Sequence, residues 1–127
     1  MKRTFITIVL LMSLSLILSS CVKKADPIVL PSTDEIIAVE IVSGNEDIIQ
    51  TDKVWIKSFV QKINEAKPTS KESIQDVPTK PEYIRVDFVS DGKISSIFVY
   101  KENSKYYIEQ PYKGIYETDD TIQEFLI

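Results

Sequence analysis

Apolar and polar residues alternate over residues 36–42 of the chain. Ile37, Val39 and Ile41 share one side of this alternation, and a period of two is typical of a strand with one buried face. The triplet Ser43-Gly44-Asn45 follows as a turn signal. We therefore expect the first strand of the domain at 36–42.

Residues 53–66 have the period of a helix instead. Thr51 and Asp52 precede them as capping residues, and Pro68 follows them as a stop signal. The apolar stripe of this segment consists of Trp55, Ile56, Phe59, Val60 and Ile63. Polar residues occupy the opposite face, so the pattern predicts an amphipathic helix whose aromatic side chains belong to the core.

Two apolar runs, 83–89 and 94–101, flank the dipeptide Asp91-Gly92. An Asp-Gly pair between runs rich in β-branched and aromatic residues is the strongest short-range signal for a β-hairpin. A turn centred on this pair places Ile84 beside Val99 and Val86 beside Ile97.

The segment Asn103-Ser104 makes a second reversal into a strand over 105–110. We expect Tyr106 beside Tyr100 and Ile108 beside Phe98 across this reversal. One face of the sheet would then carry Ile84, Val86, Ile97, Val99 and Tyr107, and the other Tyr83, Arg85, Phe98, Tyr100, Tyr106 and Ile108. A slip of one residue would exchange the faces of a strand, and this alternative stays open.

The last residues predict a turn, a strand and a short helix. Pro111 to Gly114 form the turn, residues 115–117 the strand, and Thr118-Asp119-Asp120 the helix cap. Ile122, Phe125 and Leu126 would face inward. Taken together, the elements predict an α+β fold with a mostly antiparallel sheet of about five strands, one amphipathic helix after the first strand and a short C-terminal helix.

Residues 67–81 interrupt this order with a long stretch that is poor in apolar residues. Pro68, Pro78 and Pro81 punctuate it. Structureless loops of this length are uncommon in compact domains and are either functional or disordered. Both alternatives stay open for this loop.

The N-terminus has the layout of a secretory signal peptide. Lys2 and Arg3 precede an apolar run from 5 to 18, and the segment Leu18-Ser19-Ser20-Cys21 follows. This segment resembles the lipobox of bacterial lipoproteins, in which the cysteine sulfur receives a diacylglyceryl group and the preceding peptide is removed. The alternative is a core cysteine in a transmembrane anchor, but the run is about four residues short of the roughly 18 that a spanning helix needs.

The lipobox divides the chain into three parts. Residues 1–20 would be the signal peptide, 21–35 the lipidated Cys21 with a flexible tether rich in proline and polar residues, and 36–127 a single extracytoplasmic domain. Two long acyl chains supply well over about 10 kcal/mol of membrane affinity, at about 0.8 kcal/mol per buried methylene. We therefore expect a lipid-anchored protein on the extracytoplasmic face of the cell membrane.

Composition excludes several classes of chemistry. The formal net charge of −4 becomes −6 without Lys2 and Arg3, and an acidic domain is poorly suited to bind nucleic acid. The chain has no histidine, and its one cysteine would be acylated. Disulfides, thiolate nucleophiles, cysteine metal sites and histidine general bases are thereby excluded, and we expect no cofactor and no metal site.

The C-terminal run Lys105-Tyr106-Tyr107-Ile108-Glu109-Gln110-Pro111-Tyr112-Lys113-Gly114-Ile115-Tyr116 resembles the signature of small Firmicutes lipoproteins of the YhfM-like type. The segments 66–69 and 83–86 are compatible with it. The resemblance implies an extracytoplasmic α+β domain from a Gram-positive source, which the heavy use of Ile and Lys also favours. It transfers no activity and no catalytic residues.

A carboxylate-dependent hydrolase of cell-wall polysaccharide is the one enzymatic alternative that the composition leaves open. Glycoside hydrolysis uses two acids about 5–10 Å apart across a cleft. The candidates are Asp87, Glu109, Glu117, Asp119 and Asp120. A structural role for Asp119 and Asp120 at a helix N-terminus is the more common use of such a pair.

Tyrosines are the remaining positive signal. Tyr107, Tyr112 and Tyr116 lie close together in the C-terminal run, and tyrosine suits interfaces because it joins a large apolar area to a polar tip. Each of them could instead belong to the core. The sequence predicts a non-enzymatic binding module for a protein or cell-wall partner, with Tyr112 in the Pro-Gly turn as the most exposed candidate.

Overall fold

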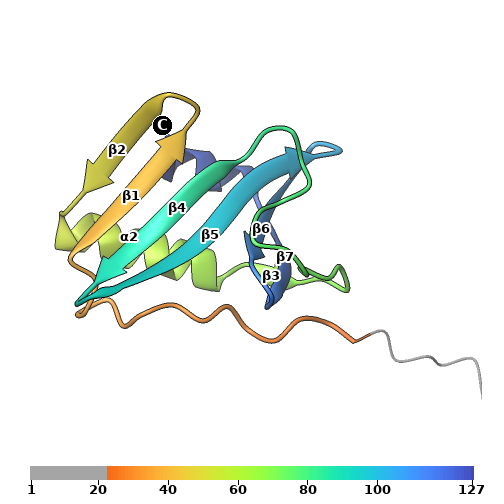
Figure 1. The fold of residues 1–127 in the computed structure, drawn as a ribbon, viewed down its shortest axis with the longest axis horizontal. Coiled ribbons are helices and arrows are strands. Elements are labelled where there is room, and N and C mark those ends of the chain that lie inside the picture. The colour runs from red at the N-terminus through yellow and green to blue at the C-terminus, as the bar shows by residue number, and fades with distance from the viewer. Residues whose placement is uncertain (1–22) are drawn as a thin grey trace, which may run out of the picture.

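The structure is a computed structural model that describes residues 23–127. Its elements are β1 Ala38–Ser43, β2 Glu46–Gln50, α2 Lys53–Asn64, β3 Lys67–Pro68, β4 Ile84–Ser90, β5 Lys93–Glu102, β6 Lys105–Gln110, β7 Gly114–Thr118 and the 3-10 helix η1 Asp120–Phe125. The strands form one antiparallel sheet in the order β2-β1-β4-β5-β6-β7-β3, and α2 and η1 lie behind it (Figure 1). The predicted α+β class is confirmed.

The sheet has seven strands and not the predicted five. The two additional strands, β2 and β3, show no alternation of apolar and polar residues long enough to predict a strand. β2 has the sequence Glu-Asp-Ile-Ile-Gln, in which Ile48 is half-buried and Ile49 is exposed, so its alternation is too short to recognise. β3 contains two residues and pairs with Tyr116 and Glu117 of β7. The helix consequently follows the second strand and not the first.

The helix α2 occupies nearly the predicted range and is capped as predicted. The Asp52 carboxylate accepts hydrogen bonds from the backbone nitrogens of Val54, at 2.7 Å, and of Trp55, at 3.1 Å. Its buried residues are Ile56, Phe59, Val60 and Ile63. The Phe59 ring stacks on Phe88 of β4 with 6.0 Å between centroids, which joins the helix to the sheet.

The hairpin at Asp91-Gly92 has the predicted register, whereas the next one differs by a residue. Tyr100 pairs with Tyr107 and Phe98 with Glu109, so the expected pairs Tyr100–Tyr106 and Phe98–Ile108 are wrong. The reason is the turn, in which Asn103 and Ser104 both have positive φ, 51° and 65°. Such a two-residue turn matches the twist of the strands and closes the hairpin one residue later than we expected.

This change of register exchanges the two faces of β6. The helix face of the sheet, which packs against α2 and η1, carries the fully buried side chains of Val86, Ile97 and Ile108. The opposite face, here called the loop face, carries Tyr100 and Tyr107, which stack with 5.9 Å between ring centroids. The predicted assignments of Tyr106, Tyr107 and Ile108 to faces were therefore all wrong.

The long loop between β3 and β4, residues 69–83, covers part of the loop face and passes in front of β6 in Figure 1. The Ser73 hydroxyl donates to the Glu109 carboxylate at 2.7 Å, and both residues are buried. The Lys71 ammonium lies 4.2 Å from the centre of the Tyr107 ring. The loop is thus ordered by polar contacts, which explains why an apolar pattern gave no sign of it.

The N-terminal segment Ala25–Leu30 is packed on the domain, which corrects the prediction of a free tether over 21–35. Its Ala25, Ile28 and Leu30 contact the core, and the segment runs along the lower rim of the sheet in Figure 1. Val29 exchanges two hydrogen bonds with the Gln110 side chain, at 2.9 and 2.7 Å. These bonds imitate the pairing of two strands, so the domain begins before residue 36.

Candidate functional site

A notch of about 720 Å³ opens at the rim of the sheet where β4 begins. β4 starts at Ile84 opposite Val99 of β5, whereas β5 continues to Glu102 and pairs there with β6. On the other side the notch is bounded by Ser43 and Gly44, next to the β1–β2 turn. The notch therefore exists because β4 begins late between two longer hairpins, whose tips stand at the upper rim in Figure 1.

Three tyrosines from different elements line the notch: Tyr83, Tyr100 and Tyr106. Tyr83 is 38% exposed, and its ring meets Phe98 edge-on with 5.2 Å between centroids. The C-terminal residues Leu126 and Ile127 complete the lining. Tyr100 is only 4% exposed, so Tyr83 and the half-buried Tyr106 are the rings that offer apolar contact area to a ligand, at little cost in conformational entropy.

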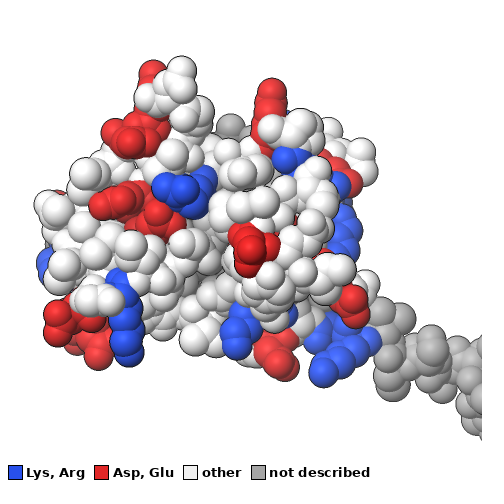
Figure 2. Space-filling view, in the orientation of Figure 1, with Lys and Arg blue, Asp and Glu red and all other residues white. Residues whose placement is uncertain are grey.

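Charged groups of both signs stand around these rings. The Lys101 ammonium lies 5.3 Å from the centre of the Tyr106 ring, and the Arg85 Nε lies 3.1 Å from the Asp87 carboxylate. Glu82 adds a negative charge. Figure 2 shows the same mixture over the whole face in view, where Lys, Arg, Asp and Glu are interspersed. The notch therefore suits a ligand with both apolar and polar groups.

The hydroxyl of Tyr100 is kept neutral by its surroundings. Burial is the main cause that raises its pKa well above the ordinary value of 10, and the nearby negative charges of Glu109 and Glu102 raise it further. A phenol with so high a pKa does not ionise at physiological pH. Tyr100 can donate a hydrogen bond, but it is not a general base.

The structure does not bring the predicted tyrosines Tyr107, Tyr112 and Tyr116 together on one surface. Tyr116 is fully buried in the core, and its hydroxyl donates to the carbonyl of Asp26. Burial and then the charge of Asp26 raise its pKa. Tyr107 is 8% exposed, beneath Lys71. Tyr107 and Tyr116 are therefore core residues, which was the alternative to a binding role that the sequence left open.

Tyr112 is exposed as predicted, with 64% of its surface accessible. It occupies the turn between β6 and β7 with φ of 61°, at the rim opposite the notch. Its hydroxyl donates to the Asp76 carboxylate at 2.8 Å, and this hydrogen bond is the main cause that raises the pKa of Tyr112. Tyr112 is therefore available for contact, but not to a ligand in the notch.

The candidate carboxylates are dispersed and already engaged. Asp87 accepts from the Ser96 hydroxyl at 2.7 Å, and Glu109 accepts from Ser73. The two acids lie on strands separated by β5 and two residues apart in register, so their α-carbons are about 12 Å apart. Glu117 pairs with Lys105 at 3.2 Å. This placement gives no support to a hydrolase with paired acids.

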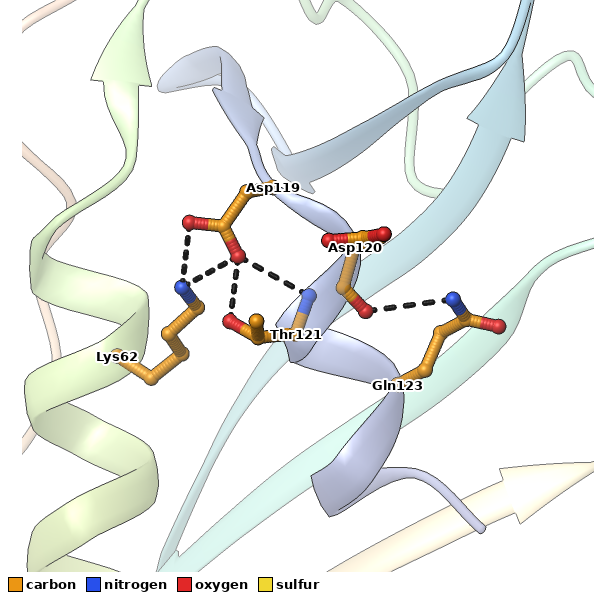
Figure 3. A network of polar contacts seen from close by, with 5 residues as sticks. All are labelled: Lys62, Asp119, Asp120, Thr121 and Gln123. Carbon is orange, nitrogen blue, oxygen red and sulfur yellow. Dashed lines mark hydrogen bonds and ion pairs between the residues drawn. The ribbon is translucent and has the colours of Figure 1, made fainter.

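Asp119 and Asp120 lie at the start of η1. This is the structural role at a helix N-terminus that the sequence offered as the alternative to catalysis. Asp119 is the N-cap, accepting from the Thr121 backbone nitrogen at 3.0 Å and from the Thr121 hydroxyl, and it binds the Lys62 ammonium of α2 at 2.6 and 2.7 Å (Figure 3). The hydrogen bond from Lys62 is the main cause that lowers the pKa of Asp119 to about 2. The ion pair between Lys62 and Asp119 thus joins α2 to η1.

Within residues 23–127, no group of three or more His, Cys, Asp or Glu side chains is placed to hold a metal ion. No helix in the same range is long and apolar enough to cross a membrane. The lipobox residues Leu18, Ser19, Ser20 and Cys21 lie outside the described residues.

The notch was not recognised in the sequence, although some of its residues carried a signal. Tyr83, Tyr100 and Tyr106 are spread over 24 positions of the chain, and no local pattern relates them. Only the register of β5 and β6 and the late start of β4 place them at one rim. Tyrosine is a residue type typical of binding surfaces, so the sequence could indicate such a surface. It could not predict that these three tyrosines lie at the same rim of the sheet.

Comparison with known proteins identifies a family. Residues 24–117 match the family model DUF5301, whose description is "Domain of unknown function (DUF5300)". No curated protein matches the chain. A protein from Ruminococcus gnavus, a Firmicute, whose structure was determined by NMR, is 35% identical with a TM-score of 0.69, over 79% of this chain and 99% of that chain. The chain therefore belongs to the DUF5301 family of domains of unknown function.

Proposed function

We propose that the protein is a bacterial lipoprotein of the YhfM-like type, anchored by acyl chains on Cys21, whose extracytoplasmic domain binds a protein or cell-wall ligand in the notch. It acts by binding and not by catalysis. The observation that carries the proposed binding role is the notch itself, a hollow of about 720 Å³ lined by three tyrosines. The anchor rests on the lipobox at Leu18–Cys21.

The tyrosine content of the notch supports binding because aromatic side chains dominate the energetics of protein interfaces. Tyr83 is the exposed member, and its contact with Phe98 fixes its orientation before a ligand arrives. A preorganised ring loses little entropy on binding. Lys101 and Arg85 at the margin can orient a polar ligand.

The family comparison supports the proposed division of the chain. The match to the family begins at residue 24, three positions after Cys21, and the Ruminococcus relative covers about four-fifths of this chain. The matched residues thus lie within the part that would remain after processing at Cys21. The Firmicute source of the relative is consistent with the YhfM-like type.

Photocrosslinking in intact cells tests the notch. A photoreactive amino acid at Tyr83 should give a discrete adduct, while the same group at the exposed Ile49 of β2, outside the notch, should not. The Lys101→Glu substitution should reduce the adduct several-fold. Equal labelling from both positions, or an adduct indifferent to Lys101→Glu, would exclude the notch as the binding site.

The anchor is tested separately. Cys21→Ser should block acylation and move the protein from the membrane fraction to the medium, and mass spectrometry of the native protein should show a diacylated N-terminal cysteine. Retention of Cys21→Ser in membranes, or a native chain that begins at Met1, would disprove the lipoprotein assignment.

A further inference from the structure

The described chain begins at one corner of the domain, where Ala25 is held against the turn between β6 and β7. The Ala25 backbone nitrogen donates to the Thr69 carbonyl at 3.1 Å. Gly114 leaves room for this contact, because a β-carbon at residue 114 would come within 2.3 Å of the Ala25 methyl. Asp26 and Val29 continue the attachment through Tyr116 and Gln110. The chain therefore leaves the domain at a fixed point.

That point lies close to the proposed anchor. Three residues lie between Cys21 and Ala25, and the four residue-to-residue steps of a fully extended chain span at most about 14 Å. The free tether is thus far shorter than the fifteen residues that the sequence suggested. An acylated Cys21 would hold this corner, and not merely the domain as a whole, at the bilayer surface.

The side chains at this corner suit the headgroup region of a bilayer. Tyr112 is 64% exposed beside Gly114, and tyrosine is enriched at membrane interfaces. Lys23, Lys24 and Lys113 are exposed there too, and an anionic surface attracts lysine ammonium groups.

The rest of the domain has the opposite electrostatic character. Asp26 and Asp76 lie near the three lysines, so these five groups sum to one positive charge, whereas the chain from Cys21 onward carries −6. An anionic bilayer attracts the corner and repels the body. The charge distribution thus orients the domain in the same sense as the short tether.

We propose that this corner, formed by Lys23, Lys24 and the turn Pro111–Lys113, is a docking surface for anionic phospholipid headgroups, and that it turns the notch away from the membrane. The inference rests on the proposed acylation of Cys21. β6 runs from the notch at Tyr106 to the corner at Gln110, and its six residues span about 20 Å. A ligand in the notch would therefore be met from the outer side.

Quenching of tryptophan by brominated lipid tests the orientation. The full chain, in its acylated form, is reconstituted in vesicles of phosphatidylcholine and phosphatidylglycerol with brominated acyl chains. Trp55→Phe removes the chain's one tryptophan. Tyr112→Trp then reports on the corner, and Glu46→Trp, an exposed site at the start of β2, is the matched control at the opposite rim. We expect at least about twofold stronger quenching for Tyr112→Trp.

Equal quenching at the two sites, in a protein shown by mass spectrometry to be acylated and to float with the vesicles, would overturn the docking surface and leave the anchor intact. A chain without acyl groups would instead overturn the proposed function, and the docking surface with it. If the Trp55→Phe background does not fold, a fluorophore on Lys113→Cys or Glu46→Cys replaces tryptophan, because the Cys21 sulfur is blocked.

The lysines are tested by charge reversal. Lys23→Glu, Lys24→Glu and Lys113→Glu together should abolish the excess quenching at Tyr112→Trp while acylation and flotation persist. The same loss is expected in vesicles of phosphatidylcholine alone. Excess quenching that survives both changes would show that the corner is placed by the tether only, and the headgroup part of the proposal would fail.

Discussion

The two faces of the sheet are covered in opposite ways. On the helix face, α2 and η1 bury a continuous apolar cluster, which includes the fully buried Ile56, Phe59 and Ile97. On the loop face, an irregular segment is held by separate polar contacts, such as those of Ser73 with Glu109 and Tyr112 with Asp76. Apolar burial is non-directional and proportional to area, whereas each polar contact depends on one geometry. The helices that cover the first face can be predicted from the period of apolar residues in the sequence. The loop that covers the second face cannot.

The largest expected effect lies on the helix face. Phe59→Ala removes a fully buried ring that contacts Trp55, Phe88 and Phe125, and should lower the free energy of unfolding by about 3–5 kcal/mol. Urea denaturation followed by circular dichroism measures this loss. A loss below about 1 kcal/mol would mean that α2 contributes little to the stability of the sheet.

On the loop face, Ser73→Ala should cost about 2 kcal/mol, because it removes the Ser73 hydroxyl donor from the buried Glu109 carboxylate. Limited proteolysis should show faster cleavage within residues 69–83, with the rest of the chain intact. Glu72→Ala, an exposed neighbour, is the matched control and should change neither measurement. Uniform proteolysis of the variant would show that the loop does not open by itself.

The N-terminal segment is a second irregular cover, and its attachment is steric as well as polar. Gly114→Ala should destabilise the protein by about 1 kcal/mol, because the added methyl group collides with Ala25 and displaces the segment. Ala25→Gly in the same chain should restore part of the loss, since the next atom of Ala25 is 3.6 Å away, while the positive φ of 159° at residue 114 still strains an alanine. Hydrogen exchange of the Ala25 amide reports the displacement. Absence of rescue would place the strain elsewhere.

The smallest effect concerns the ion pair between α2 and η1. The pKa of Asp119 is about 2 in the folded state and 3.8 ordinarily, so its contribution to stability is present above about pH 4 and is lost as the pH falls toward 2. Asp119→Asn retains a good N-cap and removes only the charge. The wild-type chain should exceed this variant in stability at pH 6, and the difference should vanish near pH 2. A difference that is independent of pH would assign the effect to capping.

Most of the helix face could be predicted from the chain. Asp52 and the stripe that includes Phe59 and Ile63 specified α2, and Asp91-Gly92 specified the central hairpin with its register. These features are local, since a cap, a period and a turn each depend on residues within a few positions. The face assignment of Ile108 failed because it required the exact turn geometry at Asn103-Ser104.

The candidate site was much less predictable. Tyr112 was correctly expected to be exposed, but Tyr107 and Tyr116 are buried, and the notch instead gathers Tyr83 and Tyr106. A tyrosine has the same sequence signal in a core as on a surface, because its ring favours burial and its hydroxyl tolerates water. Which of the two occurs depends on the neighbours that other strands supply.

The sequence by itself determined the elements that repeat with a regular period, the α+β class, and the chemistry excluded by the absence of histidine and by the single cysteine. Only the tertiary structure decided that the segment from Ala25 lies along the sheet, that residues 69–83 cover the loop face and that a notch opens above β4. The physical reason is the distance along the chain between the residues that interact. Periodicity and capping act between neighbours in the chain, whereas these three features arise from contacts between residues as far apart as Val29 and Gln110, which are 81 positions apart.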